Sequence, residues 1–224
     1  MLKNTSLCAI VRDEVSNRGG GLEKWLRGVL PFMEEAVVVD TGSIDGSLTL
    51  LYSLAAQFPK LKVYERKFDG FPSSRNYALS KVETTRALVL DADEEIREED
   101  FEKLAKFVEE NPKHGYNFTF LTLFPRGHGA TNNASAMIIR LFNVDFFECV
   151  TYTAPKISGG GELLWGEKIV PKSENYDDVM HTPVEITHHV HSLRVLNRKR
   201  SKWYKNDVFL TESPLVVGKR DGWK

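Results

Sequence analysis

The stretch Val37-Val-Val-Asp-Thr-Gly-Ser-Ile-Asp-Gly-Ser47 joins an apolar run to a loop of small and acidic residues. A continuous apolar run that is bounded by turn residues is typical of a strand in a parallel sheet whose two faces are both covered. The run ends at Asp40, and parallel sheets bind ligands at the carboxyl ends of their strands. Asp40 is therefore a candidate ligand-binding residue, whereas Ser43 or Asp45 could cap a helix that begins near Gly46.

Strand-like and helix-like segments alternate around this stretch through the first hundred residues. The expected strands are 6–11, 36–40, 62–68 and 86–91. The expected helices are 22–30, 48–58, 73–82 and 98–111, with Pro31 and Pro59 after the first two and Ser73 or Ser74 as the N-cap of the third. This order predicts an α/β fold with a Rossmann-like, mainly parallel sheet flanked by helices.

The pattern changes after residue 115. We expect strands at 116–124, 135–143 and 184–191, with a loop-like segment over 151–182. We interpret residues 1–224 as a single domain. Its parts are a nucleotide-binding-type half at 1–112, a half that completes the sheet and covers the site at 113–193, and a basic helix and tail at 194–224.

Composition narrows the class of protein. The net charge is −1, so the whole molecule has no field that would attract nucleic acid or membrane. The two cysteines, Cys8 and Cys149, do not form a disulfide framework, and no apolar run approaches the roughly 20 residues of a membrane span. We therefore expect a cytoplasmic protein.

Two further segments place polar side chains near the same edge of the expected sheet. Asp91 and Asp93 follow a buried strand, and paired carboxylates of this kind suit Mg²⁺ or Mn²⁺ bound together with a diphosphate, although they could instead cap the next helix. Arg75 falls in the first turn of a helix, where the helix dipole disfavours a cation. Its position is better explained by an anion or a base carbonyl facing it.

Four segments carry a family resemblance, and they occur in order at strand–helix spacing: 6–14, 37–47, 71–79 and 88–96. Together they resemble the family-2 glycosyltransferases with the GT-A fold, most closely a small soluble branch. The resemblance implies a nucleotide-diphosphate sugar, with a UDP-sugar as the first expectation, and an Mn²⁺ or Mg²⁺ cofactor. It also implies inverting transfer to an acceptor hydroxyl by a single displacement, with a carboxylate as the general base.

The resemblance also assigns roles to individual residues. The segment from Val11 to Glu14 would lie against the nucleotide base, and Asp40 would contact the uracil or its equivalent. Arg75 would reach the base or the diphosphate. Asp91 would hold the ribose and sugar side, and Asp93 would bind the metal directly.

The second half matches this family less closely. Where the family often has a His-Glu pair that carries the base, this chain has Val170-Pro-Lys, so Glu167 becomes the expected base. The competing carboxylates are Glu162, Asp177 and Asp178. This departure leaves open a degenerate module that binds a nucleotide sugar without transferring it.

A strand near the end of the chain offers the remaining metal ligand. His188 shares a strand face with Val184 and Ile186, and the resemblance implies that this histidine completes the metal site. His189 and His191 lie on the opposite face and are the alternatives.

The segment 194–205 holds six basic residues with Trp203 and Tyr204. It could be a solvated helix, or it could attract an anionic acceptor such as nucleic acid. A nucleotidyltransferase is a rival function, because Asn17-Arg-Gly-Gly-Gly21 resembles a loop that holds a triphosphate.

Overall fold

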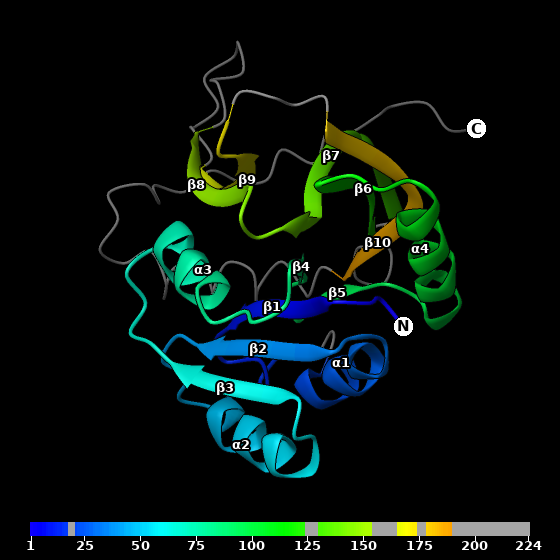
Figure 1. Ribbon diagram of the computed structural model, residues 1–224. Coiled ribbons are helices and arrows are strands. Elements are labelled where there is room, and N and C mark those ends of the chain that lie inside the picture. The colour runs from blue at the N-terminus through cyan, green and yellow to red at the C-terminus, as the bar shows by residue number, and fades with distance from the viewer. Residues whose placement is uncertain (18–20, 124–129, 154–164, 174–177, 190–224) are drawn as a thin grey trace, which may run out of the picture.

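The computed structural model describes residues 1–17, 21–123, 130–153, 165–173 and 178–189. Its centre is an eight-stranded sheet in the order β3-β2-β1-β4-β7-β6-β10-β5 (Figure 1). Strands β3, β2, β1 and β4 are parallel, β7 is antiparallel to both β4 and β6, β10 is parallel to β6, and β5 is antiparallel to β10. The expected mixed, mainly parallel sheet flanked by helices is therefore confirmed.

The first half of the chain supplies alternating strands and helices. These are β1 (Thr5–Val11), α1 (Leu22–Val29), a 3-10 turn (Leu30–Phe32), β2 (Glu35–Asp40), α2 (Ser47–Gln57), β3 (Leu61–Glu65), α3 (Phe71–Leu79), β4 (Arg86–Val89), β5 (Glu94–Glu95) and α4 (Glu98–Glu110). The second half supplies β6 (Gly115–Leu123), β7 (Ala130–Asn143), β8 (Phe147–Thr153), β9 (Trp165–Pro171) and β10 (Val179–His189). Strands from both halves thus hydrogen-bond into one sheet.

Alternation along the central strands gives the sheet two packed faces. Val38 of β2 belongs to a core that includes side chains of α1, α2 and α4, whereas Val37 and Val39 belong to a second core with α3, β8 and β9. All six residues of β2 are buried, as expected for a strand covered on both faces. Cys8 and Cys149 are buried in the second core as free thiols.

The expectation of a loop over 151–182 is wrong for the described part of that segment. Strands β8 and β9 pair antiparallel and form a separate two-stranded sheet, and β10 begins at Val179. The buried side chains of Phe147, Cys149 and Ile169 anchor this small sheet against the second core. Short amphipathic strands that lie between glycine- and proline-rich segments give little periodic signal, which is why the sequence pattern missed them.

Helix α3 begins earlier than expected, at Phe71. Its N-cap is Gly70, so neither Ser73 nor Ser74 has that role. The proline in the first turn explains the early start, because its fixed φ suits that position and its missing N–H costs nothing there. Strand β3 is shorter than expected and ends at Glu65.

Among the described residues, no helix is both long and apolar enough to cross a membrane.

Candidate functional site

The loops that follow β1 and β2 lie side by side at the carboxyl ends of these strands and are joined by hydrogen bonds. Four hydrogen bonds join them: Asp13 N–H to Ser43 Oγ (2.9 Å), Ile44 N–H to Asp13 Oδ1 (2.8 Å), Val15 N–H to Ser47 Oγ (2.9 Å) and Ser16 N–H to Asp45 Oδ2 (2.6 Å). The N-cap of α2 is Gly46, so neither Ser43 nor Asp45 has that role, although Asp45 Oδ1 accepts the N–H of Ser47, the first residue of α2. Burial raises the pKa of Asp45, but its bonds from Ser47 and Ser16 lower that pKa more.

Asp40 lies between these loops and is 2% exposed. Its Oδ1 accepts the N–H groups of Gly42 (2.9 Å) and Ser43 (2.8 Å). Its Oδ2 is buried and has no hydrogen-bond partner among the described residues. Buried carboxylate oxygens are rarely left unpaired, because desolvation without a donor is costly. The strand therefore presents one acceptor without a donor at the edge where parallel sheets bind ligands.

Arg75 and Asp91 form an ion pair behind this edge. Arg75 Nη2 donates to Asp91 Oδ1 at 2.7 Å, and Arg75 is 1% exposed while the side chain of Asp91 is 38% exposed. Burial raises the pKa of Asp91, but Arg75 and Arg140 lower it more, so it falls below the usual value. The anion that Arg75 faces is thus the chain's own carboxylate, and Asp91 is ionised and fixed.

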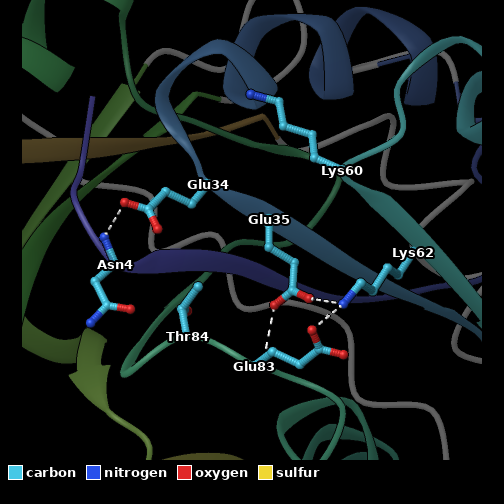
Figure 2. A pocket seen from close by; sticks show the side chains of 7 residues that line it. All are labelled: Asn4, Glu34, Glu35, Lys60, Lys62, Glu83 and Thr84. Carbon is cyan, nitrogen blue, oxygen red and sulfur yellow. Dashed lines mark hydrogen bonds and ion pairs between the residues drawn. The ribbon is translucent and has the colours of Figure 1, made fainter.

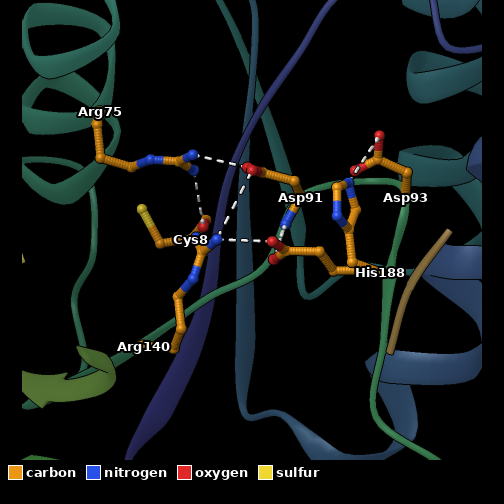
Figure 3. Close-up of polar contacts among 7 residues, drawn as sticks. Cys8, Arg75, Asp91, Asp93, Arg140 and His188 are labelled. Carbon is orange, nitrogen blue, oxygen red and sulfur yellow. Dashed lines mark hydrogen bonds and ion pairs between the residues drawn. The ribbon is translucent and has the colours of Figure 1, made fainter. Parts of the chain in front are cut away.

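Asp93, in the turn before β5, and His188, in β10, lie close together at the same edge of the sheet. The distance from Asp93 Oδ2 to His188 Nε2 is 3.9 Å (Figure 3). The His189 N–H donates to the Asp93 carbonyl at 2.8 Å. His189 itself turns to Glu95, at 3.0 Å, so of these two histidines it is His188 that faces Asp93. The alternative in which the two aspartates cap a helix does not hold, because β5 intervenes and the N-cap of α4 is Arg97.

Glu94 and Arg140 are functional candidates that the sequence patterns did not single out. Arg140 Nη2 lies 2.6 Å from Glu94 Oε1 and 3.9 Å from Asp91 Oδ2. Burial raises the pKa of Glu94 to about 8; Arg140 opposes this shift, and Asp91 and Asp93 add to it. Glu94 lies within the segment 88–96 that carries the family resemblance, and Arg140 is a charged residue inside the apolar run Met137-Ile-Ile-Arg-Leu-Phe142, but neither had been given a role.

Val11 and Glu14 have well-defined surroundings. The side chain of Val11 packs in the first core, and its carbonyl accepts both the N–H (2.9 Å) and the hydroxyl (3.0 Å) of Thr41. Glu14 is 7% exposed and accepts from Asn17 Nδ2 at 2.5 Å. A contact of either residue with a nucleotide base stays a prediction.

Glu167 lies on β9, where its backbone is paired with Thr151 of β8. Two residues along β8, Cys149 exchanges two hydrogen bonds with the side chain of Asn76, the neighbour of Arg75: Asn76 Nδ2 donates to the Cys149 carbonyl (2.8 Å) and Asn76 Oδ1 accepts the Cys149 N–H (3.0 Å). The small sheet is thereby held beside the Arg75 end of the site. The side chain of Glu167 lies outside the described part of the structure.

Asp178, a competing base, pairs with His114 and with Lys113, whose Nζ is 3.5 Å from Asp178 Oδ1. These residues lie where β6 and β10 begin, and His188 is at the other end of β10, about 30 Å away at roughly 3.3 Å per residue. The structure does not bring Asp178 to the site. The remaining expectations, for Glu162, Asp177, His191 and the basic segment 194–205, concern residues outside the described ranges.

Two cavities flank the sheet. One of about 370 Å³ lies at the amino ends of the parallel strands and is lined by Asn4, Glu34, Glu35, Lys60, Lys62, Glu83 and Thr84 (Figure 2). Three of its charged groups bind one another: Lys62 Nζ is 2.5 Å from Glu35 and 2.7 Å from Glu83. A smaller cavity of about 230 Å³ lies beside Asp93, between α1 and α4. The larger cavity is at the edge opposite to the one that binds ligands in parallel sheets, so it is not the candidate site.

The donor set fits a divalent cation that arrives with its substrate. Mg²⁺ is usually held by one or two protein carboxylates together with substrate phosphates and water, and imidazole suits Mn²⁺ as well. Asp93 and His188 provide such a pair. Within the described ranges, no group of three or more His, Cys, Asp or Glu side chains is placed to hold a metal without further ligands.

Comparisons with known proteins find a curated relative, solved structures of low similarity and a family model that match this chain. A TPR repeat-containing protein of Synechococcus elongatus is 34% identical over 95 residues, which are 42% of this chain and 22% of that protein. Structures of S. aureus TarS show weaker likeness. The 1–349 fragment with UDP has 22% identity and a TM-score of 0.45, and the match covers 56% of this chain and 37% of that one. The TarS chain of a second structure has 19% identity and a TM-score of 0.47, and the match covers 62% of this chain and 28% of that one. The chain thus spans about a fifth of the length of the curated relative that it matches. A family model described as Glycosyl transferase family 2 matches residues 17–199, and this chain belongs to that family.

Proposed function

We propose that this chain is a metal-dependent glycosyltransferase that moves a sugar from a nucleotide-diphosphate donor, first of all a UDP-sugar, to an acceptor hydroxyl. Family membership supports the reaction class. The single observation that carries the donor site is the buried Oδ2 of Asp40 at the carboxyl edge of the sheet, which has no hydrogen-bond partner in the described part of the chain. A carboxylate oxygen only accepts hydrogen bonds, and the uracil ring offers an N–H donor of matching kind.

Different residues of the chain bind and orient different parts of the donor. The paired loops after β1 and β2 fix Asp40 for the base through the hydrogen bonds that join them. The Arg75–Asp91 ion pair holds the carboxylate that we assign to the ribose and sugar side. Such preorganised groups lower the cost of orienting a substrate before reaction.

Asp93 and His188 would hold the Mn²⁺ or Mg²⁺, which when bound neutralises the diphosphate leaving group. We assign the general base to Glu167, which would take the proton of the acceptor hydroxyl as that oxygen attacks the anomeric carbon and the nucleoside diphosphate leaves. One displacement of this kind inverts the anomeric configuration. The continuous sheet built by both halves, within the residues that the structure describes, supports our interpretation of residues 1–224 as a single domain.

The test is turnover of a panel of nucleotide sugars in the presence of Mn²⁺, by the wild type and by Asp93→Ala. We expect release of a nucleoside diphosphate from one donor, and a loss of at least 100-fold in the variant. Equal turnover by Asp93→Ala would refute the assigned site. Binding of a nucleotide sugar without turnover at any metal concentration would instead identify the degenerate module. Release of pyrophosphate from a triphosphate would identify a nucleotidyltransferase. Residues 18–20 of the loop 17–21, which resembles a triphosphate-binding loop, lie outside the described ranges.

A further inference from the structure

Arg140 enters the site from an irregularity in β7. Along β6 the neighbours Tyr116 and Asn117 pair with Leu141 and Ile139, so Arg140 is the extra residue of a β-bulge. A bulge breaks the strict alternation of side chains and redirects one of them, and bulges are frequent beside functional sites. Here the side chain that departs from the alternation is that of Arg140, and its strand, β7, lies in the interior of the sheet.

The surroundings of this guanidinium are unusual for a structural arginine. Its side chain is 12% exposed, and its planar group lies 5.3 Å from the ring centroid of Phe120. Nε is buried and has no hydrogen-bond partner among the described residues. A buried donor left unpaired destabilises a fold, so stability alone does not account for placing an arginine there.

The contacts of Arg140 converge on one turn. Its Nη2 lies 2.6 Å from Glu94 Oε1 and 3.9 Å from Asp91 Oδ2. The other oxygen of Glu94 accepts the Asp91 N–H at 3.0 Å, and the Glu94 N–H donates to the Asp91 carbonyl at 2.9 Å. Two hydrogen bonds between Asp91 and Glu94 therefore close the turn that carries Asp91 and Asp93. One of them is accepted by the Glu94 carboxylate, which Arg140 orients.

The burial of its carboxyl groups explains why this turn has an arginine beside it. Asp91, Asp93 and Glu94 place three carboxyl groups within four residues, and the side chain of Glu94 is 5% exposed. Both oxygens of Glu94 accept hydrogen bonds, one from Arg140 and one from the Asp91 N–H, so the guanidinium supplies a donor that offsets the cost of burying this group. Arg75 approaches Asp91 from α3 and Arg140 approaches it from β7, so the turn is held from two elements (Figure 3).

We propose that Arg140 is a positioning residue: through Glu94 it sets the turn that presents Asp91 and Asp93 to the donor. The expected effect on catalysis rests on the proposed function. The expected effect on the geometry of the turn rests on the contacts of Arg140 alone. Both contacts with carboxylates use the same nitrogen, Nη2. A lysine at this position retains one charged nitrogen and should replace part of the interaction.

The test compares Arg140→Met, Arg140→Lys and, as a matched surface control, Arg27→Met, whose arginine pairs with Glu23 on α1. Amide hydrogen exchange resolved by residue reports the turn directly. In Arg140→Met we expect exchange of the Asp91 and Glu94 amides to accelerate at least tenfold, with β1 and β2 unchanged. We expect kcat to fall about 10- to 100-fold, as when partners of a metal ligand are removed, and the Kd for a nucleoside diphosphate with Mn²⁺ to rise as well, because the turn carries the assigned ribose and metal contacts. Arg140→Lys should recover kcat to within about fivefold of wild type, and Arg27→Met should match wild type.

Unchanged exchange at Asp91 and Glu94 in Arg140→Met overturns the proposal, and so does faster exchange with unchanged kcat. If the wild type neither binds nor turns over any nucleotide sugar, the proposed function has failed, and the exchange measurement alone still decides whether Arg140 holds the turn. If Arg140→Met does not fold, Arg140→Lys is decisive: wild-type exchange in it supports the positioning role, and a kcat as low as that of Asp93→Ala overturns it.

Discussion

At the scale of single residues, the site consists of side chains whose surroundings do not maximise stability. Among the residues that the structure describes, Asp40 has a buried oxygen without a donor and Arg140 has a buried nitrogen without an acceptor, and three carboxyl groups are clustered after β4. Each arrangement costs free energy of folding, and such costs concentrate where a ligand supplies the missing partner. These residues, rather than the well-packed core, are where function should be sought.

Arg75→Met tests one member of this set. The change leaves the Asp91 carboxylate without its closest partner, and breaking a buried pair typically costs about 3–5 kcal/mol. Because the Asp91 side chain is 38% exposed and can regain water, we expect a loss of roughly 2–3 kcal/mol in the free energy of unfolding, measured by urea denaturation. Arg27→Met, which breaks an exposed pair, should lose about 1 kcal/mol or less. A stability equal to wild type in Arg75→Met would show that the ion pair is unimportant.

At the scale of elements, the sequence predicted the first half well and the second half less well. The run that ends at Asp40 was identified as β2 because Ala36, Val37, Val38 and Val39 are all apolar, and α1 and α4 were identified from helical spacing. Strands β8 and β9 were missed because the strands of a two-stranded sheet are defined by their pairing with each other rather than by a pattern in their own sequence. Arg140 falls in the strand predicted at 135–143, but its direction was not predicted, because a bulge interrupts the alternation of side chains along β7.

Asn76→Ala tests how the small sheet is attached to the site. The side chain of Asn76 in α3 pairs with both backbone groups of Cys149 in β8, and each buried group left unpaired costs about 1–3 kcal/mol. We expect amide exchange at Cys149 to accelerate at least tenfold while β1 and β2 are unchanged. If Glu167 of the paired strand β9 is the base, kcat should fall while the Kd for nucleotide changes little. Asn111→Ala, at the end of α4, is the control. Unaltered exchange at Cys149 would show that α3 does not hold the small sheet.

At the scale of the whole molecule, the two edges of the sheet differ in how their charges are paired. The cluster at the amino edge is internally balanced. Burial raises the pKa of Glu35, but hydrogen bonds from Lys62 and Ser6 lower it more, so its pKa in the folded chain is below the usual 4.5. A depressed carboxyl pKa contributes stability above the unfolded value and loses it as the pH falls through the folded value. We therefore expect stability to decrease as the pH falls below about 4.5.

Glu35→Gln checks this pH dependence. The variant should be less stable than wild type at pH 7, and its Tm should fall less than that of the wild type between pH 6 and pH 3.5, as measured by calorimetry. Glu109→Gln, which alters an exposed carboxylate, should follow the wild type. If Glu35→Gln and wild type lose the same Tm over this range, Glu35 does not contribute to acid sensitivity.

The central claim is that the carboxyl edge binds a nucleoside diphosphate through Asp40, and calorimetric titration of UDP with Mn²⁺ into wild type and Asp40→Asn tests it most directly. The amide can still accept the Gly42 and Ser43 N–H groups at one atom, but it replaces the unpartnered oxygen with a donor that opposes a base N–H. Hydrogen bonds to charged groups are worth about 1.5–3 kcal/mol, so we predict a Kd raised about 10- to 100-fold, with an unchanged Tm for the free protein. Equal affinity of both proteins for UDP, or no binding of any nucleoside diphosphate by the wild type with or without Mn²⁺, would contradict the account.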